Sequence, residues 1–165
     1  FGRELWIDGD DFMEVPVKKY FRLFPGNEVR LKGGYFITCN EVVKNEDGSI
    51  KELLCTYDPE TKSGTEGGNR KVKGTIHFVE ASTAVKIKIR EYQTLMIEDE
   101  EGNLELNPDS LHETWGYAEP SVSDVKAGER FQFFRKGYYI ADSELTTDDE
   151  KVFNSIVSLK SSWKK

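Results

Sequence analysis

The chain has 165 residues, of which 37% are hydrophobic and 32% charged, and its formal net charge is −7. This composition is too apolar for a disordered chain, and the net charge disfavours nonspecific binding of nucleic acid over the whole surface. No apolar run approaches the ~20 residues of a membrane span, and the N-terminus lacks the pattern of a secretory signal. We therefore expect a cytoplasmic globular protein. Because the chain begins at Phe1 without an initiator methionine, we also expect it to be a piece of a longer polypeptide.

The first 26 residues predict one strand followed by short helices. Residues 4–7 are apolar and aromatic, which favours a strand, and Asp10 or Asp11 then supplies the capping chemistry of a helical turn. Residues 17–24 predict a second helical turn, which Pro25 and the glycine after it would end.

From residue 28 to residue 84 the apolar period becomes two, which is typical of strands. A hairpin turn is expected at Asp47-Gly48, since this dipeptide favours tight β-turns. Residues 58–69 are polar and rich in glycine, and we expect them to be the least ordered part of the chain. The predicted strands are 29–31, 35–43, 50–57 and 72–79.

The second half also reads as strands. Residues 85–93 alternate cleanly, so that Lys86, Lys88 and Arg90 would form a basic, solvent-facing side of one strand. A hairpin is expected over 131–140, turning at Lys136-Gly137. Further strands are predicted at 95–97, 114–118 and 152–159.

Many short strands with turns between them predict an all-β protein built from two packed β-barrels, with short helices near the N-terminus. The small residues 81–84 suggest the crossing between the barrels. We expect a nested arrangement, with a distal barrel at residues 10–84 and a proximal barrel made of 1–9 and 85–165.

The sequence contains no convincing catalytic or metal-binding constellation. His77 and His112 lack neighbours that would suggest a triad or a metal site, and no Gly-rich phosphate-binding loop occurs. Cys39 and Cys55 lie in apolar runs without Cys-x-x-Cys spacing, which predicts buried, reduced thiols. We therefore expect no catalytic site and no cofactor within the chain.

Residues 17–32 form a basic island in this acidic chain. This stretch contains five cationic residues and one anionic residue, Glu28, which gives a local charge of +4. Either a phosphate-bearing partner or an ordinary solvated face would explain this pattern. Arginines interleaved with aromatic residues are typical of proteins that read single-stranded RNA, because the planar guanidinium can stack on bases and bond their edges. The cations are Lys18, Lys19, Arg22, Arg30 and Lys32.

Several sequence blocks, in this order, resemble the C-terminal anticodon-binding region of glutaminyl-tRNA synthetases. Archaeal-type and eukaryotic glutamyl-tRNA synthetases, which share the architecture, are the neighbouring family. The resemblance covers essentially the whole chain. The blocks are GRELWIDGDDF, KKYFRLFPGNEVRLKGGY, CTYDPET, NRKVKGTIHFVEAS, WGYAEPS, FQFFRKGYY and VFNSIVSLKSSW.

This resemblance implies two barrels similar to ribosomal protein L25, bound to the anticodon stem-loop of tRNA(Gln). By position in the motifs, Arg22 would read the third anticodon base and Arg30 the first, with Lys32 and Lys19 as neighbouring contacts. Gln132 and Arg135 would contact the middle uracil. Phe21 and Phe134 depart from the residues that relatives can carry there, which affects the flanking contacts.

The resemblance also implies what lies outside the chain. Neither the HIGH-type nor the KMSKS-type ATP motif occurs in it. A catalytic domain of the same polypeptide would attach glutamine to tRNA(Gln) using ATP and Mg, and the enzyme would be a monomer. The alternative is a free-standing L25-like barrel that binds ribosomal RNA or a protein partner.

Overall fold

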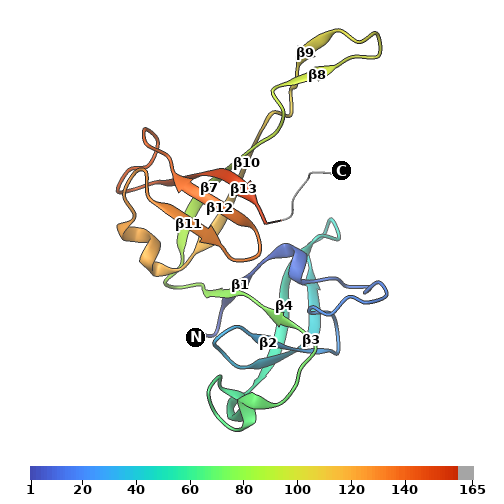
Figure 1. The fold of residues 1–165 in the computed structure, drawn as a ribbon. Coiled ribbons are helices and arrows are strands. Elements are labelled where there is room, and N and C mark those ends of the chain that lie inside the picture. Colours follow the sequence, from blue (N-terminus) through green and yellow to red (C-terminus); the bar gives the residue numbers. More distant parts are fainter. Residues whose placement is uncertain (160–165) are drawn as a thin grey trace. The chain divides into compact units, whose positions relative to one another are not determined.

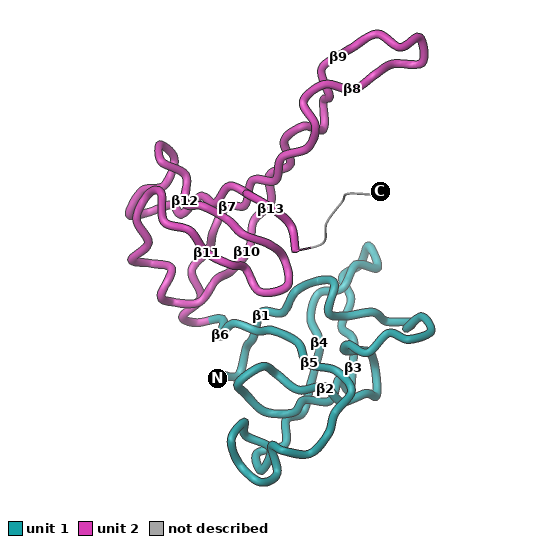
Figure 2. The backbone as a smooth tube through the Cα atoms, viewed as in Figure 1, with its two compact units in different colours: residues 1–81 teal, residues 82–165 magenta. Residues whose placement is uncertain are grey.

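The computed structural model describes residues 1–159 and divides the chain into two compact units, Phe1–Ala81 and Ser82–Lys165 (Figures 1 and 2). Regular structure in the described range consists of β-strands and short 3-10 turns, without an α-helix. The all-β prediction is therefore confirmed. In the same range, no helix has the length and apolar character needed to cross a bilayer.

Unit 1 is built on a four-stranded sheet in the order β4-β3-β2-β5, beside a two-stranded sheet of β1 and β6. The hairpin between β3 and β4 turns at Asp47-Gly48, as the dipeptide predicted, with Gly48 at a φ of 83°. The strands are β1 (Leu5–Ile7), β2 (Glu28–Leu31), β3 (Phe36–Lys44), β4 (Ile50–Asp58), β5 (Thr75–Ile76) and β6 (Phe78–Glu80).

The core of unit 1 follows from the alternation along these strands. Apolar side chains of β2, β3 and β5 point to one side of the sheet, where Leu23 covers them from the preceding segment. Full burial of such side chains contributes about 1.5–3 kcal/mol each, before the entropy cost of ordering them. The buried cluster is Leu23, Val29, Leu31, Ile37, Cys39 and Ile76.

Unit 2 contains a five-stranded sheet in the order β10-β7-β13-β12-β11. Its apolar face packs on the 3-10 turn Pro120–Asp124, and the centre of the core is formed by Ile87, Tyr139 and Phe153. The strands are β7 (Val85–Tyr92), β10 (Leu111–Ala118), β11 (Arg130–Phe133), β12 (Gly137–Ala141) and β13 (Lys151–Ser158).

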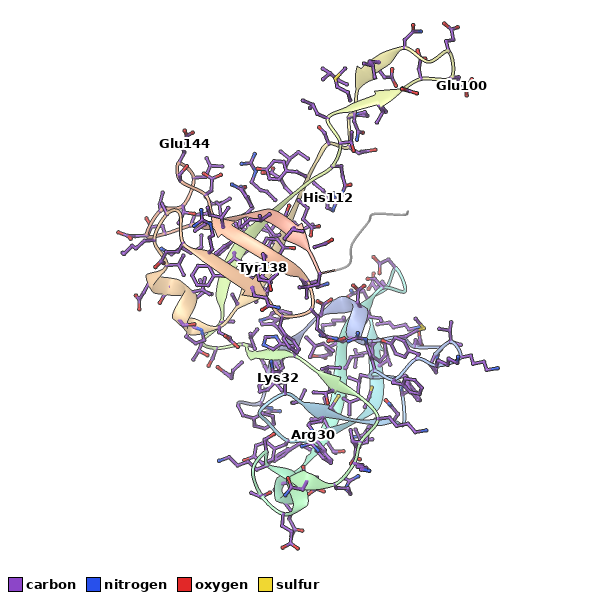
Figure 3. All side chains as sticks on the ribbon, in the orientation of Figure 1. Arg30, Lys32, Glu100, His112, Tyr138 and Glu144 are labelled. Atoms are coloured by element: carbon purple, nitrogen blue, oxygen red, sulfur yellow. The ribbon has the colours of Figure 1, made fainter. Side chains whose placement is uncertain are left out.

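A two-stranded arm extends the β7–β10 ladder beyond the sheet (Figure 1). It consists of β8 (Met96–Glu98) and β9 (Leu104–Leu106), joined by an acidic turn that carries Glu100 at the tip (Figure 3). The strand predicted at residues 95–97 corresponds to β8, but β9 and the first residues of β10 were missed. A three-residue Leu-Glu-Leu segment is too short to show a period.

The predicted helices near the N-terminus are wrong. Gly9–Asp11 forms a single 3-10 turn, and Asp8, not Asp10 or Asp11, caps it by accepting a bond from the Asp10 N–H at 3.1 Å. Residues 17–24 are not helical. The chain turns at residues 17–20 and bends again at Arg22, and Leu23 then forms a bridge with Phe12. Tertiary pairing therefore outweighed a short apolar pattern.

Residues 58–69, expected to be the least ordered part, form a packed loop. Thr61 is only 2% exposed, and its hydroxyl accepts a hydrogen bond from the Phe36 N–H at 2.9 Å. A Cβ placed on Gly68 would lie 2.2 Å from the Lys62 carbonyl oxygen, so the close approach requires glycine. Glycine here serves packing, whereas the sequence pattern had suggested mobility.

The remaining predictions on architecture have different outcomes. The sheets are open and of mixed direction, with parallel pairs β2–β5 and β7–β13, and the two-barrel form stays a proposal. Residues 1–9 belong to unit 1, where β1 pairs with β6, whereas the nested prediction placed them with the second barrel. Residues 160–165 of that predicted barrel lie outside the described range.

Candidate nucleic-acid interface

The backbone around Arg22 is held by hydrogen bonds from both sides. The Leu23 N–H donates to the Asp11 carbonyl at 2.9 Å, and the Met13 N–H donates to the Leu23 carbonyl at 3.1 Å. On the other side, the Asn27 amide donates to the Arg22 carbonyl at 3.0 Å and accepts from the Phe24 N–H at 2.8 Å. Arg22 is therefore presented from a bend whose backbone is held on both sides.

The side chain of Arg22 pairs with a buried carboxylate. Its NH1 group donates to Oδ1 of Asp11, which is fully buried, while the Arg22 side chain remains 38% exposed. A buried carboxylate needs a cationic partner, so this pair anchors one nitrogen of the guanidinium at Asp11. The fork has five N–H donors, which makes one bond to Asp11 compatible with recognition of a base edge. Burial, and then the charges of Asp11 and Asp10, raise the pKa of Tyr20 nearby.

Arg30 lies in β2 and is bound to the 58–70 segment. Its guanidinium stacks over the ring of Phe36 at 4.4 Å, and it donates to the carbonyls of Gly68 and of Arg70, the latter at 2.9 Å. Arg70 in turn forms a bidentate pair with Glu28 at 2.6 and 2.8 Å, which lowers the pKa of Glu28. The predicted base reader Arg30 thus also organises a loop.

Lys32 follows β2 and is exposed (Figure 3). It stands two residues after Arg30, and side chains with this spacing point to the same side of a strand. Its own N–H donates to the Ile76 carbonyl at 2.9 Å, which extends the β2–β5 pairing. The backbone of Lys32 is therefore anchored, while its side chain reaches the surface.

Lys19 and Arg135 share an unusual backbone conformation. Their φ angles are 69° and 63°, and within residues 1–159 they are the two non-glycine residues with positive φ. Each is the third residue of a tight turn, in which the fourth N–H donates to the first carbonyl at 3.0 Å (Val17) or 2.9 Å (Phe133). This conformation costs a non-glycine residue roughly 1–2 kcal/mol. Such strain is concentrated at functional sites in proteins.

Gln132 lies in β11, exposed and directly opposite Tyr138 of β12, which Figure 3 labels. The turn that follows carries Phe134 and Arg135, with the Arg135 guanidinium 5.7 Å from the centre of the Phe134 ring. One hairpin therefore presents an amide, a guanidinium and two exposed aromatic rings.

The predicted site residues fall into two groups. Lys19, Arg22, Arg30 and Lys32 belong to unit 1, and Gln132 and Arg135 to unit 2. Sequence reasoning missed the partners that hold the first group, Asp11, Asn27 and Arg70. The contacts of Asn27 span three and five positions, that of Asp11 spans eleven and that of Arg70 spans forty, and none of these separations follows a periodic pattern that a single sequence would show.

The basic side of β7 is present but is largely paired with anions. Lys88 lies 3.3 Å from Glu150, and Arg90 forms ion pairs with Glu113 and Asp142. Lys86 and Lys88 also cover the exposed ring of Trp115, at 4.4 and 4.9 Å from its centre. This face is therefore close to neutral overall. In the described range, no three or more His, Cys, Asp or Glu residues are grouped to hold a metal ion.

Comparison with known proteins adds independent information. Residues 1–58 and 75–142 match two family models, both described as the anticodon-binding domain of class I tRNA synthetases for glutamate and glutamine. Glutamine–tRNA ligase of Clostridium perfringens is 54% identical over 99% of the chain, and that of Rhodopirellula baltica is 44% identical over 100% of it. The chain spans only 31% and 29% of the length of these two relatives.

Proposed function

The chain belongs to the anticodon-binding domains of class I glutamyl- and glutaminyl-tRNA synthetases, and we propose that it recognises the anticodon of tRNA(Gln) for a glutamine–tRNA ligase. The observation that carries this proposal is the similarity of the whole chain to glutamine–tRNA ligases. The cations of residues 17–32, of which the three lysines are exposed and the two arginines half-buried, give it a physical basis, since an acidic protein must bind RNA through a local patch.

In this proposal Arg22 reads the third anticodon base and Arg30 the first. A planar guanidinium can bond two acceptors of a base edge at once, which a lysine cannot do. The ion pair with Asp11 supports this role for Arg22, because it orients the fork before RNA arrives. Lys32 and Lys19 would contact the RNA next to these bases.

Gln132 and Arg135 are proposed to contact the middle uracil. The glutamine amide offers both a donor and an acceptor, which matches the Watson–Crick edge of uracil. The exposed position of Gln132 opposite Tyr138 and the fixed turn at Arg135 support this assignment. Phe134 and Tyr138 have exposed rings, and exposed aromatic rings can stack on unpaired bases.

Arg30 would read its base while remaining connected to the loop. Its bonds to Gly68 and Arg70 occupy part of its donor set. Binding of RNA to Arg30 would therefore be coupled to the position of residues 67–70, and loop contacts would influence recognition of the first base.

The activity of the whole enzyme extends the proposal beyond this chain. A catalytic domain of the same polypeptide would attach glutamine to tRNA(Gln) with ATP and Mg, in a cytoplasmic, monomeric enzyme. The two units would be the two L25-like barrels of that enzyme. The relatives reported above are glutamine–tRNA ligases, which favours the synthetase over a free-standing barrel that binds ribosomal RNA or a protein partner.

Arg22→Lys in the full-length enzyme tests the proposal. Lysine keeps a cation for Asp11 but loses the planar fork. We therefore expect kcat/KM for tRNA(Gln) to fall, by an amount that corresponds to about 1–3 kcal/mol of lost transition-state stabilisation. The KM values for ATP and glutamine, measured at saturating tRNA(Gln), should be nearly unchanged. The matched control is Lys51→Arg, on the exposed strand β4. Unchanged tRNA kinetics in Arg22→Lys would exclude Arg22 as a base reader.

A further inference from the structure

The two cysteines of the chain face each other across neighbouring strands. Cys39 of β3 is the register partner of Cys55 of β4 in an antiparallel pair. Sequence analysis had predicted two buried thiols. The structure corrects this, since Cys39 is buried and Cys55 is exposed.

The hydrogen bonds of Cys39 identify the kind of cross-strand pair. Its N–H donates to the Asn27 carbonyl at 3.3 Å, and its carbonyl accepts from the Gly26 N–H at 2.8 Å. Both groups therefore point away from β4, which makes Cys39 and Cys55 a non-hydrogen-bonded pair. In such pairs the Cα atoms lie about 4.5 Å apart, within the ~4.4–6.8 Å range that disulfides span.

The two thiols already interact. Each thiol influences the pKa of the other, and the Cys39 thiol donates to the Glu41 carbonyl with 3.8 Å between sulfur and oxygen. Desolvation, and then the neighbouring Cys39, raise the pKa of Cys55 to about 12. Both thiols therefore stay protonated at neutral pH, with one accessible to reagents and the other held beside it.

We propose that Cys39 and Cys55 are a reversible redox pair, which a small-molecule disulfide such as oxidised glutathione converts to a cross-strand disulfide. Deprotonated Cys55 attacks one sulfur of the oxidised glutathione, forming a mixed disulfide and releasing one glutathione. Cys39 then loses its proton and attacks the Cys55 sulfur, which breaks the mixed disulfide and releases the second glutathione. The protein loses two hydrogen atoms, and the oxidised glutathione is reduced to two thiols.

The position of Cys39 links this pair to the segment that presents Arg22. Its backbone holds Gly26 and Asn27, and the Asn27 side chain holds the Arg22 carbonyl. A cross-strand disulfide would restrain β3 where these bonds are made. We therefore expect oxidation to change the position or mobility of the segment that carries Arg22.

Thiol counting and intact mass test the pair directly. After incubation with oxidised glutathione, the protein should lose both thiols and two hydrogens in mass, without an added glutathione, and dithiothreitol should reverse the change. Cys39→Ser should instead keep one glutathione on Cys55, because no second thiol can displace it. A lasting glutathione adduct on the protein that keeps both cysteines, or a disulfide-linked dimer, would overturn the proposal.

The pH dependence of the reaction gives a second measurement. Below the raised pKa of Cys55 the thiolate fraction grows about tenfold per pH unit, and thiolate is the attacking species. The rate of oxidation should therefore rise about tenfold from pH 7 to pH 8. A rate that levels off within this interval would contradict Cys55 as the attacking thiol.

The link to Arg22 rests on the proposed function and has its own test. Binding of a tRNA(Gln) anticodon stem-loop should weaken about threefold or more in the oxidised protein, recover on reduction, and be redox-insensitive in Cys55→Ser. Equal affinities of the oxidised and reduced forms would remove the link. Failure of both forms to bind would count against the proposed function, while the thiol count would still decide the redox pair.

Discussion

The two groups of proposed RNA-reading residues are presented in different ways. In unit 1, Arg22 and Arg30 are fixed by contacts with distant residues, namely the buried Asp11 and the carbonyls of Gly68 and Arg70. In unit 2, Arg135 is itself the residue with a left-handed backbone in a tight turn, so its backbone is fixed locally. In the first arrangement the contacts of the arginine join separate segments of the unit, whereas in the second the backbone conformation of the arginine is set within one hairpin.

The largest expected effect is a difference in the free energy of unfolding between a variant of the unit 1 group and a variant of the unit 2 group. Arg22→Ala leaves the buried Asp11 without its cation, and we expect a loss of about 2 kcal/mol in the free energy of unfolding. Gln132→Ala should cost less than about 0.5 kcal/mol, since the side chain is exposed. Urea unfolding of both variants measures this difference. Equal losses would show that the ion pair between Arg22 and Asp11 does not stabilise the fold.

The next prediction concerns binding without a loss of stability. Arg135→Ala should weaken binding of the anticodon stem-loop by about 1–3 kcal/mol, while the midpoint of urea unfolding stays nearly the same. Lys126→Ala, at a cation that is 75% exposed elsewhere in unit 2, is the matched control. A stem-loop with cytosine in place of the middle uracil should bind Arg135→Ala and the unmodified protein more equally. If Arg135→Ala lowered stability as much as binding, the contrast between the units would fail.

Replacing a strained residue by glycine should raise the stability of the protein and at the same time weaken RNA binding. Glycine adopts the left-handed conformation without strain, so Lys19→Gly should raise the free energy of unfolding by about 0.5 kcal/mol, after the entropy cost of glycine. The same change should weaken RNA binding, because a cation is lost. Lys19→Ala is the control, since it removes the cation but keeps the strain. A less stable Lys19→Gly would exclude strain at this turn.

The smallest expected effect is on pH dependence and concerns the loop that holds Arg30. The hydrogen bond from Arg70 lowers the pKa of Glu28 below 4.5. A depressed carboxyl pKa stabilises the fold above the unfolded-state pKa, and the stabilisation is lost as pH falls through the folded-state value. Arg70→Gln should therefore reduce the fall in unfolding free energy between pH 5 and pH 3, by a small amount because the pair is exposed. An unchanged pH profile would show that this ion pair adds no stability.

The predicted and observed strands agree where a strong local pattern exists. Val85–Tyr92 alternates over its full length, and the Asp47-Gly48 turn carries its own conformational preference. The prediction failed for residues 17–24, where Tyr20, Leu23 and Phe24 fit a helical spacing by chance. Pairing of Leu23 with Phe12 and the Asn27 contacts determine that segment, and both join residues several positions apart.

By itself, the sequence determined the all-β class, most strand positions, the family resemblance and the list of proposed RNA-reading residues, because each depends on local periodicity or on motifs. Only the tertiary structure decided that Asp11 is buried beneath Arg22, that Arg30 is bound to the 67–70 loop, and that Cys39 faces Cys55. These depend on strand register and chain crossings, which bring together residues whose separation along the chain carries no periodic signal.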